Sequence, residues 1–146
     1  MTPPPSSLAR GLGYAGLIPF VGAAVLCHLG GALAPFAPLA LKALLAYAAT
    51  IVSFLGGIHW GLAFLQDADR PARFLWGVSP SLLAWLAGLV PASAGLLLLS
   101  ATLVVALAVD WRVYPRLGLQ AWLPMRLHLT SVAVLSCLAG AWAVVG

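Results

Sequence analysis

The chain has 146 residues, of which 63% are hydrophobic and 7% are charged, and its formal net charge is +4. Soluble globular domains carry roughly 25% charged residues, so this composition excludes the soluble class and indicates an integral membrane protein. Once several spans of about 20 residues are subtracted, no room is left for a separate soluble domain.

Apolar runs bounded by proline, glycine or charged residues predict five membrane-spanning helices. Only helices and closed barrels satisfy backbone groups in lipid, and these runs lack the alternating pattern of barrel strands. The third and fourth runs are short, and a tight link at Pro91 predicts that they form an antiparallel hairpin. We therefore expect an all-α bundle in one domain, residues 11–146, after a short disordered tail, residues 1–10. The predicted spans are residues 11–29, 41–65, 75–90, 95–109 and 127–145.

Positive charge orients the predicted bundle. With five spans, the N-terminus and the loops at residues 66–74 and 110–126 share one side of the membrane. That side holds six arginines, whereas the opposite side has only Lys42. By the positive-inside rule the N-terminus lies in the cytoplasm, or in the matrix if the protein is mitochondrial, and Gly146 lies outside. The net charge then needs no nucleic-acid partner, because orientation and anionic lipid headgroups explain it. The six arginines are Arg10, Arg70, Arg73, Arg112, Arg116 and Arg126.

Polar and ionisable residues gather at one depth, in the inner half of the predicted bundle. His59 lies about two turns from the inner end of the second span, and His128 lies about one turn into the fifth. An ionisable side chain in hydrocarbon is costly, so it is a candidate functional residue by default. His28, by contrast, falls near the outer end of the first span. The candidate ligand- or partner-binding residues of this inner layer are Tyr14, His59, Trp60, Ser79, Ser81, Asp110, Arg126 and His128.

Small residues and prolines predict how the helices pack. Ser53, Gly57 and Gly61 recur at four-residue spacing in the second span, and the third has a similar stripe that includes Gly77. Such stripes allow helices to approach closely, and His59 projects from a different face, which it shares with Gly56. Pro19 and Pro80 each remove a backbone hydrogen bond, so we expect them to kink the first and third spans.

Each candidate residue also has a purely structural interpretation. His59 and His128 can be neutral imidazoles that bond hydroxyls or carbonyls of neighbouring helices. Asp110 and Arg126 flank the same loop and can form an interfacial ion pair. Tryptophans such as Trp60 near the inner interface are typical of an aromatic belt.

Functional interpretations use the same residues. His59 and His128 could ligate a haem iron axially, in which case they are the metal ligands. Alternatively, His59 with Tyr14 and Asp110 could bond a quinone or a lipid headgroup that enters from the inner leaflet. Hydrolytic chemistry is disfavoured, because the chain has only three acidic residues, Asp67, Asp69 and Asp110, and no phosphate-binding loop. No catalytic residue is predicted.

Four strings of the sequence resemble a known family. They are residues 12–20 (LGYAGLIPF), 53–61 (SFLGGIHWG), 77–85 (GVSPSLLAW) and 127–130 (LHLT). They are similar to those of a small bacterial and mitochondrial inner-membrane family, a domain of unknown function that includes the transmembrane protein 69 type. The resemblance covers nearly the whole bundle. It implies a five-helix inner-membrane protein, and it brings no established activity and no catalytic residues.

These observations favour a non-enzymatic accessory or assembly protein of the energy-converting membrane, whose polar inner layer binds a small ligand or a partner. The expected surroundings are the lipid bilayer and other inner-membrane subunits, in bacteria or in mitochondria. Binding of haem or quinone through His59 and His128 is the first alternative. A small-solute or proton-coupled transporter is the second, and it is disfavoured because the outer half has few polar groups and no inverted repeat is visible.

Overall fold

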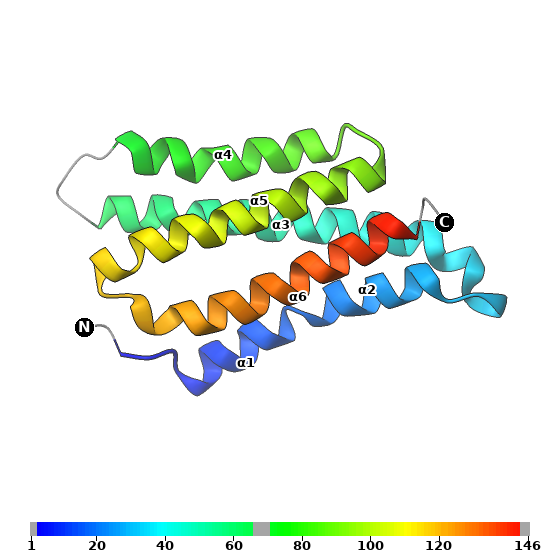
Figure 1. Ribbon diagram of the computed structural model, residues 1–146, viewed down its shortest axis with the longest axis horizontal. Coiled ribbons are helices and arrows are strands. Elements are labelled where there is room, and N and C mark those ends of the chain that lie inside the picture. The colour runs from blue at the N-terminus through cyan, green and yellow to red at the C-terminus, as the bar shows by residue number, and fades with distance from the viewer. Residues whose placement is uncertain (1–2, 66–70, 144–146) are drawn as a thin grey trace.

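The computed structural model describes residues 3–65 and 71–143, and every regular element in these two ranges is helical. The long helices run along one common axis (Figure 1). The helices are α1 (Ser7–Ala15), α2 (Ile18–His28), α3 (Ala37–Phe64), α4 (Pro71–Ala87), α5 (Ala92–Val113) and α6 (Leu123–Trp142). Short 3₁₀ segments connect them: η1 (Gly31–Phe36), η2 (Pro115–Leu117) and η3 (Gln120–Trp122).

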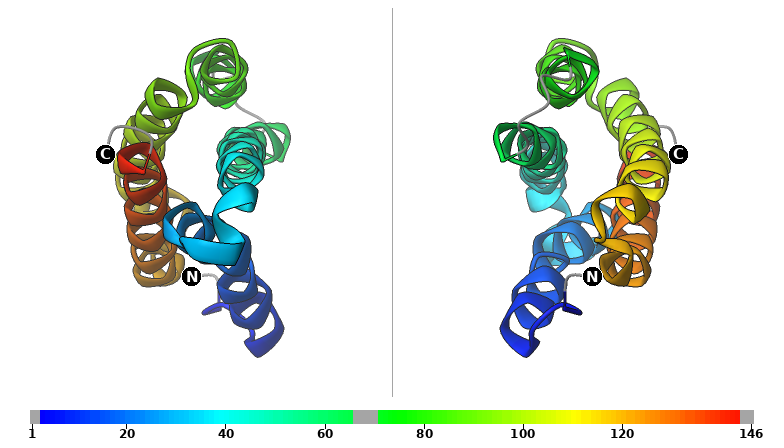
Figure 2. Two further views of the ribbon diagram at one scale, coloured as in Figure 1. Left: turned by 90° about the vertical axis from the view of Figure 1, so that its right-hand side faces the viewer. Right: turned by 90° about the vertical axis from the view of Figure 1, so that its left-hand side faces the viewer.

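Seen end-on, the bundle is a ring of helices (Figure 2). α4 lies at one pole, α5 and α6 form one side, and α3 with α2 forms the other. The interior is closed by apolar side chains of α3, α5 and α6, among them the fully buried Leu44, Leu99 and Cys137. Many large apolar side chains point outward instead, for example Leu65, Leu75 and Trp142. An apolar outer surface of this kind suits a bilayer and not water.

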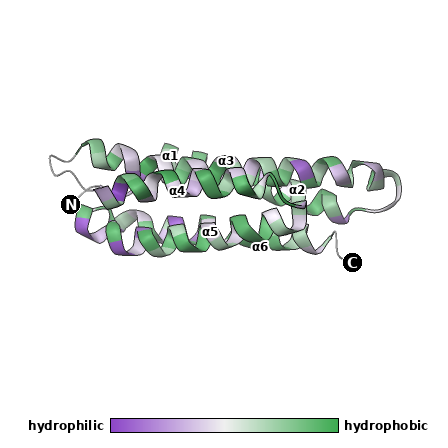
Figure 3. Ribbon diagram, turned by 90° about the horizontal axis from the view of Figure 1, so that it is seen from above, coloured by the Kyte–Doolittle hydropathy of each residue, from purple (hydrophilic) through white to green (hydrophobic). Residues whose placement is uncertain are grey.

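Within residues 3–65 and 71–143, four helical segments are long and apolar enough to cross a membrane, namely Ser7–His28, Gly31–Phe64, Ala92–Val113 and Gln120–Trp142. The third predicted span, residues 75–90, corresponds in position to α4, which is shorter, at 17 residues. Hydrophilic residues lie chiefly toward the ends of the bundle, and the middle is apolar (Figure 3). An all-helical membrane protein is therefore confirmed.

The first predicted span is broken into α1 and α2 at Gly16 and Leu17. Pro19 stands in the first turn of α2, where its missing N–H costs nothing. The break frees the Gly16 carbonyl oxygen, and the Tyr47 hydroxyl of α3 donates to it at 2.9 Å. Tyr47 also packs edge-on against Phe20, with ring centroids 5.0 Å apart. Instead of the kink expected from Pro19, the first span is divided into two helices, whereas α4 remains helical through Pro80.

The close approach of α3 and α4 uses a different stripe from the predicted one. Gly57 and Gly61 are exposed, and a Cβ atom added to either would meet no atom within 4 Å. Gly56 is the residue in contact, because a Cβ there would clash with the Gly77 carbonyl oxygen. The sequence prediction of the stripe was therefore wrong on α3. Gly56 lies one position away from Gly57 and so about 100° around the helix.

Positive residues gather at the end of the bundle where α3 and α5 end and where α1, α4 and α6 begin. Arg10, Arg73, Arg112, Arg116 and Arg126 lie at or near these helix ends. Lys42 lies near the start of α3, at the opposite end. The predicted cation Arg70, the acidic residues Asp67 and Asp69, and Gly146 lie outside the described residues.

Candidate functional site

Asp110 joins three helices in a buried polar cluster. One carboxylate oxygen, Oδ1, lies 2.9 Å from His59 Nε2 of α3, and the other, Oδ2, accepts a hydrogen bond of 2.8 Å from Arg126 Nε of α6. The residues His59 and Asp110 are only 2% and 3% exposed. Because an ionised carboxylate only accepts hydrogen bonds, the His59 Nε2 atom carries the hydrogen. Asp110 is thus the partner that a histidine in a membrane helix requires.

Aromatic rings enclose the His59 imidazole. Trp76 of α4 meets it edge-on at a centroid distance of 6.3 Å, and the Tyr114 ring lies 6.4 Å away. Burial raises the pKa of the Tyr114 phenol to about 12, with Asp110 adding to the effect and Arg126 opposing it. Tyr114 therefore stays neutral at physiological pH. The uncharged rings of Trp76 and Tyr114 therefore cover the His59 imidazole.

Local helix electrostatics explain why the three charged or ionisable groups need each other. Asp110 lies in the last turn of α5, where the negative end of the helix dipole disfavours a carboxylate. Arg126 lies in the first turns of α6, where the positive end disfavours a cation. Bringing the two helix ends together pairs the charges and offsets both penalties. The short loop with η2 and η3 makes this pairing possible.

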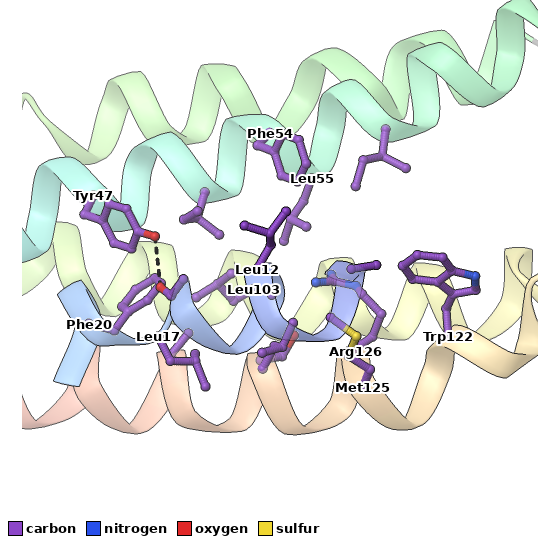
Figure 4. Close-up of a pocket in the computed structure, with 18 of the residues that line it drawn as sticks. Leu12, Leu17, Phe20, Tyr47, Phe54, Leu55, Leu103, Trp122, Met125 and Arg126 are labelled. Atoms are coloured by element: carbon purple, nitrogen blue, oxygen red, sulfur yellow. Dashed lines mark hydrogen bonds between the residues drawn. The ribbon is translucent and has the colours of Figure 1, made fainter. Parts of the chain in front are cut away.

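A cavity of about 430 Å³ lies beside the cluster, between α1, α2, α3, α5 and α6. Its walls are almost entirely apolar. Arg126 and Trp122 lie toward one end, and Tyr47 and Phe20 lie toward the other (Figure 4). Tyr114 and Thr130 also line it. Neither His59 nor His128 is among the described residues that do so.

Three buried polar atoms of the described residues have no hydrogen-bond partner: Arg126 Nη2, Thr130 Oγ1 and Trp76 Nε1. Two of them belong to residues of the cavity wall, Arg126 and Thr130. An unsatisfied buried polar group costs about 1–3 kcal/mol, so such groups call for an explanation. Arg126 thus bonds Asp110 with one nitrogen and leaves another without an acceptor.

The predicted pairing of His59 with His128 does not describe the contacts they make. His128 is exposed on α6, and its Nδ1 lies 3.3 Å from the Tyr14 hydroxyl of α1. Tyr14 is 43% exposed. Tyr14 and His128 therefore form a surface contact between α1 and α6, while His59 belongs to the buried cluster.

The remaining predicted residues serve other contacts. Trp60 Nε1 donates to the Phe74 carbonyl at 2.8 Å and ties the end of α3 to the start of α4. The Ser79 hydroxyl donates to the Leu75 carbonyl of its own helix. Ser81 lines a shallow surface groove between α3 and α4. Of the eight predicted residues, the structure brings His59, Asp110 and Arg126 together.

His28 has a structural partner at the far end of the bundle. Its Nε2 donates to the Ala139 carbonyl oxygen at 2.9 Å and links α2 to α6. This contact lies at the end of α2, away from the cluster of His59, Asp110 and Arg126.

Sequence reasoning missed Tyr114 and Thr130. Each lies four residues after a residue that was predicted, Asp110 or Arg126, and so on the same helix face. That spacing was the available signal. By itself this spacing does not single out a site residue, because hydroxyls at helix ends are common and carry no charge.

Comparisons with known proteins agree with this architecture. The family described as "Protein of unknown function (DUF3429)" matches residues 5–142. The chain belongs to the DUF3429 family. It is 38% identical over 135 residues to "Transmembrane protein 69" of Xenopus tropicalis, with 86% of this chain and 50% of that protein covered. This DUF3429 chain thus spans about half the length of the curated relative, and no solved structure matches it. The predicted resemblance is confirmed.

Proposed function

We propose that this DUF3429 protein is a non-enzymatic accessory or assembly protein of the energy-converting inner membrane. Its buried cluster of His59, Asp110 and Arg126, with the adjoining cavity, serves as a binding site for a small ligand or partner. The inner membrane is that of bacteria, or of mitochondria in eukaryotes. Support comes from the small all-helical bundle and from the membrane relative named above.

The observation that favours binding over catalysis is the state of Asp110. The sequence has three acidic residues, and Asp110 is the one that lies in the described bundle. Both of its carboxylate oxygens are taken, one by His59 and one by Arg126. A general acid or base must reach the proton that it transfers. A buried carboxylate whose two oxygens are both hydrogen-bonded to side chains of the protein does not reach one. The unpartnered donors of Arg126 and Thr130 are better suited to hold a bound group than to change it.

We further propose five membrane crossings, with α4 as the short third one. α4 lies alongside α3 and α5 and runs antiparallel to both along the bundle axis (Figure 1). The arginine-rich end then faces the cytoplasm or the matrix. The binding site consequently opens near the inner leaflet.

Affinity purification of the tagged protein from native membranes in mild detergent tests the accessory role. We expect defined membrane subunits to co-purify in a constant ratio to the tagged chain. His128→Ala, which changes an exposed residue of α6, is a matched variant for His59→Ala. Recovery of the tagged protein alone, from both detergent and nanodisc preparations, would contradict the accessory role.

A further inference from the structure

Two residues of the cavity wall, Arg126 and Thr130, each have a buried hydrogen-bonding atom without a partner in the described chain. Thr130 is 3% exposed, and its Oγ1 atom has no partner. Arg126 is held in place by its Nε bond to Asp110, which leaves Nη2 buried and unpartnered. Both residues line the same cavity. A guanidinium nitrogen can only donate, so the group that satisfies it must be an acceptor.

The other residues of the cavity wall indicate that most of the bound molecule is apolar. Leu12, Leu17, Ile51, Leu103 and Leu129 are typical of the apolar side chains around the cavity. A volume of about 430 Å³ is within the range of small-molecule sites, which is roughly 300–1,000 Å³. The occupant therefore has an apolar body and an oxygen-bearing head.

Charge decides what kind of oxygen this head presents. The cation Arg126 and the anion Asp110 balance each other. A carboxylate or phosphate group would leave an excess negative charge in a buried, apolar setting, which is costly. A carbonyl oxygen accepts hydrogen bonds without adding charge.

We propose that the cavity binds an apolar molecule through a carbonyl oxygen, which accepts hydrogen bonds from Arg126 Nη2 and Thr130 Oγ1. The acyl ester of a bilayer lipid and the ring carbonyl of a quinone both have this chemistry. The inference rests on the proposed function in that the cluster is a binding site, and it names the ligand class. It differs from the sequence hypothesis, because the donors are Arg126 and Thr130 and not the two histidines.

Photolabelling of the full chain tests this assignment. The protein is reconstituted into phosphatidylcholine vesicles that contain a photoreactive acyl phosphatidylcholine, and the labelled peptides are identified by mass spectrometry. We expect labels on the cavity-lining residues within 9–20 and 122–133, above the level found on other lipid-facing segments. Excess decyl-benzoquinone separates the two sources. It removes the cavity label if the site takes a quinone, and it leaves the label if the site takes an acyl ester.

Two variants and one control make the test specific. Thr130→Val keeps the shape of the side chain and removes the hydroxyl, and Arg126→Lys keeps the charge beside Asp110 and removes Nη2. Each should lower cavity labelling by about twofold to tenfold, the effect expected of one lost hydrogen bond. Thr102→Val is the control, because Thr102 is equally buried and its hydroxyl bonds Leu98 of its own helix.

The contrary result is equally clear. If Thr130→Val, folded as judged by circular dichroism, is labelled in the cavity as strongly as the unchanged protein, the proposal is overturned. Labelling spread evenly over all lipid-facing helices would overturn it as well. If Arg126→Lys does not fold, Thr130→Val alone decides. Neither result depends on co-purifying subunits, so failure of this inference and failure of the accessory role can be told apart.

Discussion

Asp110 links α3, α5 and α6 through two hydrogen bonds at the arginine-rich end of the bundle. Charged groups buried at this depth are stable only as a complete set. Removing the carboxylate would leave Arg126 buried without its counter-charge and His59 without its acceptor. Removing this one carboxylate should therefore destabilise this end of the molecule.

Substituting Asp110 alone should destabilise the bundle more than substituting Asp110 and Arg126 together. Breaking a buried ion pair on one side costs about 3–5 kcal/mol, because one charge remains uncompensated. We expect Asp110→Leu to show such a loss, and Asp110→Leu combined with Arg126→Met to recover much of it. Reversible unfolding in mixed micelles measures both. Equal losses in the single and double variants would show that the pair has no energetic coupling.

The role of His59 can be read from two substitutions. His59→Gln retains a side-chain donor for Asp110 and should keep the bundle folded. His59→Leu removes the donor and should cost about 1–3 kcal/mol. If His59 is structural, His59→Gln also keeps the co-purifying partners or bound ligand. Loss of these from a folded His59→Gln protein would instead assign His59 a direct binding role.

At the scale of the helices, α3 contacts most of the other helices of the bundle. It packs against α2, α4 and α5, and it contributes His59 to the cluster and Tyr47 to the break between α1 and α2. Gly56 lies on the same side of α3 as the buried His59, where α4 approaches most closely. Close packing and the polar site therefore share one face of this helix.

The glycine contact between α3 and α4 provides a test with a built-in control. Gly56→Ala should destabilise the bundle by about 1–3 kcal/mol, because its Cβ would meet the Gly77 backbone. Gly57→Ala, one position along, meets no atom within 4 Å and should be neutral or slightly stabilising, since alanine favours helix. Thermal unfolding in detergent compares the two. Equal melting temperatures would argue against the close approach.

At the scale of the whole molecule, topology decides what the site can meet. The cluster lies at the end of the bundle that also holds Arg10, Arg73, Arg112 and Arg116. With five crossings, this end faces the cytoplasm or matrix, and the two chain ends lie on opposite sides. With four crossings, both chain ends would lie on the same side.

Reporter fusions distinguish these two topologies. We expect a green fluorescent protein fused before Met1 to fluoresce in the bacterial cytoplasm. The same reporter fused after Gly146 should be exported and stay dark. An alkaline phosphatase fused after Gly146 should be active. Fluorescence from both fusions would require an even number of crossings and would exclude α4 as a span.

The sequence alone determined the membrane class, the helical architecture and the family. These follow from local quantities: apolar run length, charge placement and composition. Pro19, a proline within an apolar run, also predicted a kink in the first span. The sequence did not predict that the span would divide into α1 and α2.

Only the tertiary structure decided which polar residues meet. His59, Asp110 and Arg126 come from three helices, and their contacts depend on the rotation of each helix about its axis, which apolar patterns do not fix when nearly every face is apolar. The same uncertainty led to the prediction of Gly57 in place of Gly56 as the contact residue. In a bilayer the lipid-facing and buried sides are alike in composition, so packing geometry, and not hydropathy, selects the inner face.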